Sequence, residues 1–192
     1  MKSSNTWTAD EMKNSTEHFV KEWVIPFYQS KITDWEGKRE KLLQVYDTFS
    51  KPIMEEGEQL TDFNLSDSRY DMIIQHILFD DLKRGVKEMG FNQVPTVQNS
   101  WFQIYNIAHS HAVHNHGMGA LSVVCYIKYD PDYHRPTTFI APFHSLDDGN
   151  VMEYEPSGIE EGSIVIFPSS IAHYVPTNQS TVERMVLACN IR

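Results

Sequence analysis

The histidines of this chain are concentrated in its second half, at spacings that suit a metal site. His114 and His116 form a His-x-His pair, as do His109 and His111. In an extended segment, side chains at i and i+2 lie on one face about 7 Å apart, so both rings of a pair can point at one ion. A facial metal site takes a third ligand from a facing strand. His173 is the candidate for that third ligand.

A His-x-His match also arises by chance, and histidine-rich stretches are often solvated loops. The run EGSIVIFPSSIAHYVPTNQSTVERMVLACN strengthens the metal interpretation, because in it a buried strand ends at Phe167 and Pro168, His173 follows, and Arg184 begins the next strand. An unpaired cation entering a β-core is costly. We therefore expect Arg184 to bind a carboxylate, because a guanidinium can donate two parallel hydrogen bonds to it. The alternative is an ordinary surface salt bridge.

Helices are expected to precede these residues. Up to residue 94 apolar side chains recur at three- and four-residue spacing, which predicts amphipathic helices. Ser68 is a candidate cap and Gly90 a candidate stop for the last of them. The periodic positions are Phe19, Trp23 and Phe27, then Leu42, Leu43, Val45, Tyr46 and Phe49, then Tyr70, Ile73, Ile74, Ile77, Leu78 and Leu82.

Strands are expected after Pro95. Five short β-rich runs stand between turn signals, and no helix of useful length fits between them. The runs are SWFQIYNI, LSVVCYIKY, TTFIAPF, GSIVIFP and ERMVLACNI. We predict an α+β protein: an antiparallel jelly-roll (double-stranded β-helix) core at residues 95–192, with a helical N-terminal extension at residues 1–94 packed on it as one structural unit.

Composition narrows the classes of function. The chain has 192 residues, which fits one domain, and its formal net charge of −10 predicts no nucleic-acid partner and no anionic membrane surface. It has no long apolar run, so we expect a soluble protein without a leader. Cys125 and Cys189 form no disulfide framework, which favours a reducing, cytoplasmic setting.

The second half of the sequence resembles a known family. The residues are Trp101, His114-Asn115-His116, Ser122 to Tyr126, Gly162 to Pro168, His173, Asn178, Ser180, Arg184 and Asn190. Together they resemble the iron(II)- and 2-oxoglutarate-dependent oxygenases. More narrowly, they are similar to the prolyl-hydroxylase-like branch, including members carried by phages of marine cyanobacteria. The similarity covers about residues 95–192.

This resemblance implies an enzyme, a hydroxylase that converts 2-oxoglutarate and dioxygen to succinate and carbon dioxide while it oxidises a C–H bond of a small-molecule or peptide substrate. It implies His114, His116 and His173 as iron ligands. It implies Arg184 as the partner of the distal carboxylate of 2-oxoglutarate, with hydroxyl groups from Tyr126 and Tyr105. For a phage-encoded member, the host cytoplasm would be the location.

His116 departs from the family pattern, because most of the superfamily has Asp or Glu there. Either the site has three histidines, or a carboxylate such as Asp130 or Asp132 completes it; the first is simpler. Two rival functions stay open: a cupin-type three-histidine enzyme that does not use 2-oxoglutarate, and a non-catalytic binding protein. The oligomeric state and the substrate, prolyl or otherwise, are not determined by the sequence, although residues 130–158 and the helices are expected to take part in substrate recognition.

Overall fold

The computed structural model describes residues 25–50, 54–56, 59–63 and 70–192. In this part of the chain two helices and eleven strands are defined. They are β1 (Tyr28–Lys31), α2 (Trp35–Phe49), β2 (Met54–Glu56), β3 (Gln59–Thr61), α3 (Asp71–Glu88), β4 (Val97–Tyr105), β5 (His111–His114), β6 (Leu121–Lys128), β7 (Thr138–His144), β8 (Val151–Tyr154), β9 (Ser163–Pro168), β10 (His173–Val175) and β11 (Arg184–Ile191).

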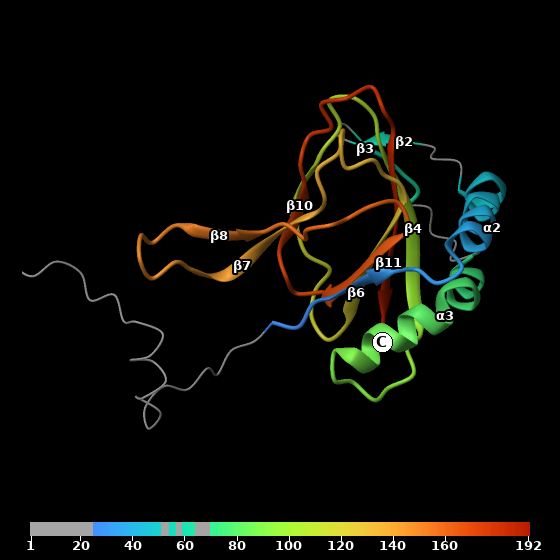
Figure 1. Ribbon diagram of the computed structural model, residues 1–192, viewed down its shortest axis with the longest axis horizontal. Helices are drawn as coiled ribbons and strands as arrows, with labels where there is room; N and C mark the ends of the chain where they lie inside the picture. Colours follow the sequence, from blue (N-terminus) through green and yellow to red (C-terminus); the bar gives the residue numbers. More distant parts are fainter. Residues whose placement is uncertain (1–24, 51–53, 57–58, 64–69) are drawn as a thin grey trace, which may run out of the picture.

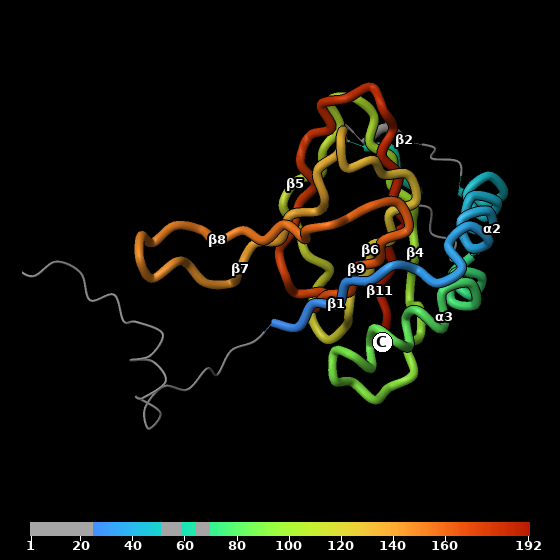
Figure 2. Tube along the Cα trace, in the orientation of Figure 1, coloured from blue at the N-terminus to red at the C-terminus, as the bar shows by residue number. Residues whose placement is uncertain are grey.

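The strands form two antiparallel sheets that face each other (Figure 1). The larger has the order β1-β9-β6-β11-β4-β3-β2, and the smaller has the order β5-β10-β7-β8. Neighbouring strands in both sheets are often distant in sequence, as in the path of β1 beside β9 (Figure 2). This is the predicted double-stranded β-helix, with helices packed on it, and the prediction of the fold class is confirmed.

The two faces of the larger sheet bury different sets of side chains. Along β6, Val123, Cys125 and Ile127 point to the helices, while Val124 and Tyr126 point to the smaller sheet. This period of two explains why the run LSVVCYIKY is apolar throughout: both faces of the strand are covered. Helices α2 and α3 cover the outer face (Figure 1). The site therefore has to be sought on the inner face.

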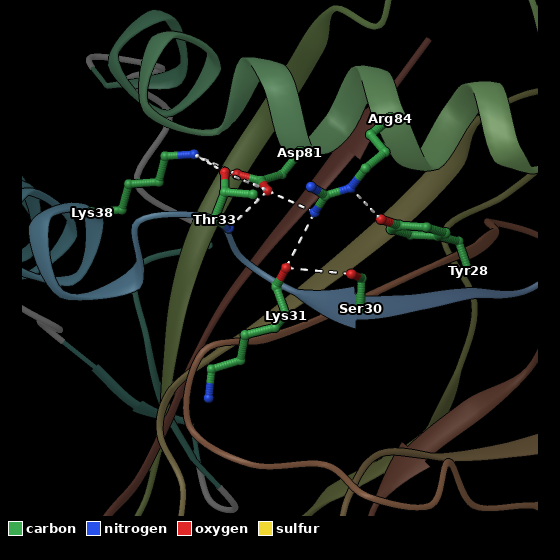
Figure 3. Close-up of polar contacts among 7 residues, drawn as sticks. All are labelled: Tyr28, Ser30, Lys31, Thr33, Lys38, Asp81 and Arg84. Carbon is green, nitrogen blue, oxygen red and sulfur yellow. Dashed lines mark hydrogen bonds and ion pairs between the residues drawn. The ribbon is translucent and has the colours of Figure 1, made fainter.

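A buried carboxylate joins the helices to the first strand of the larger sheet (Figure 3). Asp81 of α3 is fully buried, and its carboxylate contacts Lys38 Nζ at 2.5 Å and Arg84 Nη2 at 2.9 Å. It also accepts hydrogen bonds from the backbone N–H and the hydroxyl of Thr33, both at 3.0 Å. Arg84 donates further to Tyr28 Oη and to the carbonyl of Lys31. Every oxygen of this buried anion is paired, which is the condition for tolerating it.

Helix α3 lies unusually close to the sheet at Gly85. A Cβ at this position would lie 2.5 Å from Ile166 Cδ1 and 2.7 Å from Tyr28 Cδ1. The absence of a side chain is therefore required for this close approach.

One hairpin departs from the compact body. Strands β7 and β8 (orange in Figure 1) end the smaller sheet and project from the rest of the molecule. All four residues of β8 are exposed, and β8 is the last strand of its sheet within the described residues. The exposed apolar residues of this hairpin are Phe143, Leu146, Val151, Met152 and Tyr154.

The sequence located the larger elements better than the smaller ones. The second and third apolar stripes correspond to α2 and α3, and all five β-rich runs are strands. Phe19, Trp23 and Ser68 lie outside the described residues, and Phe27 lies outside any helix. Before residue 95 the chain also supplies β1, β2 and β3 to the larger sheet, which the prediction of a helical extension did not include. The boundary at residue 95 stays a prediction.

Candidate active site

Two short strands of the smaller sheet bring three histidines together. In the pairing of β5 with β10, His114 lies directly opposite His173. His116 follows β5 by two residues, and its backbone N–H donates to the carbonyl of Ser169 at 2.9 Å. One ring nitrogen from each of His114, His116 and His173 lies within 4.8 Å of the other two. This arrangement can hold one metal ion by three nitrogen ligands.

Hydrogen bonds fix which nitrogen of each ring is free. His114 Nδ1 lies 2.8 Å from the carbonyl of Ala112, and His173 Nδ1 lies 2.9 Å from the carbonyl of Ile171. A carbonyl only accepts, so each Nδ1 carries the hydrogen. Each Nε2 then keeps its lone pair for a ligand.

The third ring is held by the opposite sheet. His116 Nδ1 lies 2.9 Å from Asn190 Oδ1 on β11 and 2.9 Å from Ser122 Oγ on β6. Asn190 lies opposite both Ser122 and Asn99 in the ladder, and its Nδ2 donates to Asn99 Oδ1 at 3.0 Å. Asn190 Oδ1 is therefore the acceptor for His116, which again leaves Nε2 free.

Burial keeps these rings neutral. It lowers the pKa of His173 to about 3 and also lowers the pKa of His114 and of His116. A neutral imidazole is the form that ligates a metal. The three rings thus fit a divalent ion without first losing protons at neutral pH.

No carboxylate joins this cluster within the described residues. Asp130 and Asp132, the alternative ligands, lie in the turn after β6, where Asp130 N–H donates to His134 Nδ1 and Asp132 is exposed. The other His-x-His pair does not complete a site either. His111 stacks on His114 with ring centroids 3.9 Å apart, whereas His109 Nδ1 accepts from the backbone N–H of Asn106.

A buried cation lies on the same inner face of the larger sheet. Arg184 begins β11, directly opposite Tyr105 of β4, and is only 2% exposed. Its guanidinium carbon lies 4.8 Å from the Tyr105 ring centroid and 5.5 Å from that of Tyr126. Its one recorded hydrogen bond within the described residues runs from Nη2 to Thr137 Oγ1 at 3.3 Å. No acid pairs with Arg184 in this part of the chain, so the surface salt bridge considered for it is absent.

Several polar atoms beside Arg184 lack partners. Among the described residues Arg184 Nε and Nη1 and the hydroxyl of Tyr105 are buried without a hydrogen bond. Burial raises the pKa of Tyr105, so this phenol stays a donor. Tyr126 Oη accepts the backbone N–H of Thr137 at 3.1 Å. A buried guanidinium next to an unpaired hydroxyl is the environment expected for an anionic ligand.

Apolar side chains connect the two clusters. Phe167 and Phe139 lie with Tyr105 and Tyr126 in one buried cluster between the sheets. The His173 ring lies 5.0 Å from Phe167 and 5.9 Å from Phe139, centroid to centroid. His173 and the guanidinium therefore border one buried interior, whereas His114 and His116 are half-buried at its edge.

Sequence reasoning named these six residues but missed others around them. Thr137, which contacts both Arg184 and Tyr126, lay in a segment interpreted only as a substrate-recognition region. Of the residues expected to line a cleft there, Tyr129, His134 and Phe139 are buried, and Tyr133, Arg135 and His144 are exposed. No local signal in the sequence pointed to Thr137, because its contacts with Arg184 and Tyr126 depend on how the strands pack.

Comparisons with known proteins agree with this geometry. A family model described as "Putative 2OG-Fe(II) oxygenase" matches residues 99–190. The fold is similar to that of a Pseudomonas putida prolyl-4-hydroxylase, with a TM-score of 0.53 and 16% identity over 88% of this chain and 93% of that one. No curated protein matches the sequence.

Two further solved structures share the fold. The epimerase SnoN from nogalamycin biosynthesis has a TM-score of 0.64 and 11% identity, over 88% of this chain and 78% of that one. HygX from Streptomyces hygroscopicus, solved with nickel, 2-oxoglutarate and hygromycin B bound, has a TM-score of 0.61 and 10% identity, over 87% of this chain and 82% of that one. At these identities the likeness shows the fold alone.

Proposed function

We propose that this chain, a member of the 2-oxoglutarate- and iron(II)-dependent oxygenase superfamily, is a hydroxylase whose metal is held by three histidines. His114, His116 and His173 would be the iron ligands. Arg184, Tyr105 and Tyr126 would bind the distal carboxylate of 2-oxoglutarate, with Thr137 as a further hydroxyl partner. The observation that carries the proposal is the convergence of three neutral imidazoles beside a buried guanidinium without an anion.

The bound metal and cosubstrate would supply the oxidising power, as 2-oxoglutarate and dioxygen are converted to succinate and carbon dioxide and a C–H bond of the substrate becomes C–OH. The protein's own residues have other tasks. The acceptors of the three Nδ1 hydrogens orient the imidazoles. Arg184 can donate to a carboxylate from Nε and Nη1, which have no partner among the described residues, and Tyr105 can donate its hydroxyl. Phe139 and Phe167 would exclude water from the region between His173 and Arg184.

A second candidate function has one observation in its favour. His116 stands where most of the superfamily has a carboxylate, so the site resembles the three-histidine set of cupin-type dioxygenases that need no keto acid. Arg184 discriminates between the two, because only the first function has a use for a buried guanidinium that pairs with no acid among the described residues.

The proposal is tested with protein loaded anaerobically with iron(II). Addition of 2-oxoglutarate should produce the weak visible charge-transfer absorption of a keto-acid chelate, and admission of oxygen should produce succinate. Arg184→Met should abolish both signals, while Arg135→Met, which removes an exposed arginine paired with Glu155, should leave them intact. Metal-dependent turnover that survives Arg184→Met would favour the cupin-type alternative. Failure of the chain to retain iron would indicate a binding protein.

The setting of the protein is also part of the proposal. Within the described residues no helix has the length and apolar character needed to cross a membrane. Cys125 and Cys189 are buried free thiols, which supports a reducing cytoplasm as the location. The net charge of −10 supports a small molecule or a peptide, rather than nucleic acid or an anionic membrane, as the partner.

A further inference from the structure

We propose that the cavity beside the three histidines binds its substrate through an oxyanion, a carboxylate or a phosphate, and not through a neutral or a cationic group. The inference rests on the proposed function, because it concerns the substrate of the same metal site. The cavity has a volume of about 590 Å³, and His114 and His116 form part of its wall. A molecule bound there therefore lies beside the ion that these rings would hold.

The loaded site would carry a positive charge. Neutral imidazoles leave both charges of a divalent ion uncompensated, and no carboxylate joins the three rings within the described residues. Arg184 adds a third positive charge that pairs with no acid in this part of the chain. 2-Oxoglutarate brings two negative charges, so one positive charge is left. A carboxylate in place of His116 would have cancelled it, whereas here a substrate anion can do so.

The wall of the cavity does not neutralise this charge. Among its eleven described lining residues none is Asp or Glu. Asp62 stands between two lining residues, but its carboxylate accepts hydrogen bonds from Tyr70 Oη and from the backbone N–H of Phe102. Both of these partners belong to the core beneath the helices. A cationic substrate would therefore meet only like charge in the cavity, whereas an anion would meet the opposite charge that its desolvation requires.

The side-chain amides of the wall add hydrogen-bond donors. Gln59 Oε1 accepts a hydrogen bond from Gln103 Nε2 at 3.1 Å, and Asn99 Oδ1 accepts one from Asn190 Nδ2 at 3.0 Å. Asn115 Oδ1 likewise accepts a backbone N–H at 3.0 Å. In these three amides the oxygen is used internally, whereas the NH₂ group has no acceptor among the described residues. Each NH₂ group can therefore donate to a ligand.

The ring of His111 is a further donor. Gln103 Nε2 lies 3.2 Å from His111 Nδ1. Because an amide nitrogen only donates, His111 Nδ1 accepts this bond and the ring hydrogen sits on Nε2. Among the amide oxygens of the wall, only that of Gln103 has no partner in the described residues. Donors thus outnumber acceptors, and an oxyanion is the group that only accepts and forms the stronger, charge-assisted bonds.

Two aromatic rings supply the apolar part of the cavity. Trp101 and Phe63 meet edge to face with centroids 5.0 Å apart. Rings of this kind favour an apolar body next to the anionic group. The substrate class is therefore an organic acid or a phosphate ester with an apolar part.

The test measures dissociation constants by saturation-transfer NMR on the full chain, loaded with one equivalent of Zn²⁺ and saturated with 2-oxoglutarate. The probes are phenylacetate, its neutral analogue phenylacetamide, the cation 2-phenylethylammonium and phenyl phosphate. We expect at least one of the two oxyanions to bind about 10-fold or more tightly than the amide, and the ammonium to bind most weakly. A preference for either oxyanion supports the inference and identifies the group.

Two outcomes of this titration would overturn the inference. The first is equal affinity for the acids and the amide. The second is release of 2-oxoglutarate by phenylacetate, which would place the acid at Arg184 instead of in the cavity.

Substitutions then assign the anion to the cavity. Asn99→Asp and Gln59→Glu keep the oxygen that the neighbouring amide uses but replace the NH₂ group by a second carboxylate oxygen. Each should weaken binding of the preferred oxyanion by about 10-fold, with a smaller effect on phenylacetamide. Gln98→Glu, at the exposed neighbouring position of β4, adds the same charge outside the cavity and should leave both affinities unchanged. Equal oxyanion affinity in all three variants would contradict the inference.

The loading of the chain separates this inference from the proposed function. Zinc content and the rise in Tm with 2-oxoglutarate are measured first. A chain that holds neither ligand would contradict the proposed function, and the inference would fall with it. A loaded chain without a preference for an oxyanion would contradict the inference alone.

Discussion

At the scale of single residues, the replacement of a carboxylate by His116 is matched by its surroundings. An imidazole that ligates through Nε2 needs an acceptor at Nδ1, and Asn190 Oδ1 supplies it. Asn190 is fixed in this role because its nitrogen is used by Asn99. The three-histidine set therefore has its own supporting network.

Loss of Asn190 should weaken metal binding. In Asn190→Ala the His116 ring loses the acceptor that fixes its orientation, and removal of such a partner typically lowers metal affinity about 10- to 100-fold. The affinity is measured by titration against a competing chelator, with circular dichroism to verify folding. Gln98→Ala serves as the control. An unchanged affinity in Asn190→Ala would mean that His116 is not a ligand.

The pH at which metal binding fails should lie below the ordinary histidine range. A free imidazole has a pKa of about 6.5, and on that basis alone the affinity would begin to fall there. Burial lowers the pKa of His114, His116 and His173 in the folded chain, so protons compete with the metal only in more acidic solution. We expect the metal affinity to begin its fall at a lower pH than the ordinary histidine pKa would give, measured by isothermal titration over a pH series.

The same shift makes the metal-free fold sensitive to acid. The pKa of His173 is about 3 in the folded chain and about 6.5 in the unfolded chain. Between these pH values the unfolded chain therefore binds a proton at His173 that the folded chain does not bind. The free energy of unfolding should therefore decrease as the pH falls from about 6.5 towards 3. Urea unfolding at several pH values measures this decrease, which should be smaller in His173→Gln.

The sequence indicated the candidate ligands but not their neighbours. The spacing of His114 and His116 and the order of His173 and Arg184 are local features that the chain displays directly. The contacts of Asn190 with Ser122 and Asn99 depend on the register of three strands. That register is set by packing over the whole sheet, so no local sequence pattern predicts it.

At the scale of elements, the length of a helix or strand decided whether it could be predicted from the sequence. Helices α2 and α3 and the strands of six or more residues have enough turns or alternations to be recognised. Strands β1, β2, β3, β5, β8 and β10 have only three or four residues. Such strands are held by pairing with their neighbours rather than by their own propensity. Both strands that carry candidate ligands, β5 and β10, belong to this group.

The Asp81 cluster is expected to stabilise the helical layer without affecting the site. Asp81→Asn leaves Lys38 without its charged partner and should destabilise the fold by about 3 to 5 kcal/mol, as measured by urea unfolding. Asp80→Asn, which alters the exposed neighbouring carboxylate, is the matched control. Below the unfolding transition, the metal affinity of both variants should equal that of the unaltered chain.

At the scale of the whole molecule, the candidate site joins the two sheets. His114 and His173 belong to the smaller sheet, whereas the acceptors of His116 and the guanidinium of Arg184 belong to the larger one. Ligands that bind only the folded state stabilise it by mass action. A metal and a dicarboxylate should therefore stabilise the packing of one sheet on the other.

Thermal unfolding should reveal this coupling. A redox-inert divalent ion should raise the Tm, and 2-oxoglutarate should raise it further; at about 100 times the Kd each ligand adds about 2.7 kcal/mol. In Arg184→Met the rise in Tm caused by the metal should remain, and the further rise caused by 2-oxoglutarate should disappear. A 2-oxoglutarate increment that persists in Arg184→Met would show that the dicarboxylate binds elsewhere.

The projecting β7–β8 hairpin has a consequence for behaviour at high concentration. Strand β8 is an edge strand of its sheet in the described part of the chain, and an edge of this kind can pair with a strand of another molecule. Glu153 lies within this strand, between Met152 and Tyr154, and Asp147 and Asp148 lie in the connecting turn. Carboxylates at such an edge repel a second copy of the same edge. We therefore expect the acidic residues of the hairpin to reduce aggregation through its exposed apolar side chains.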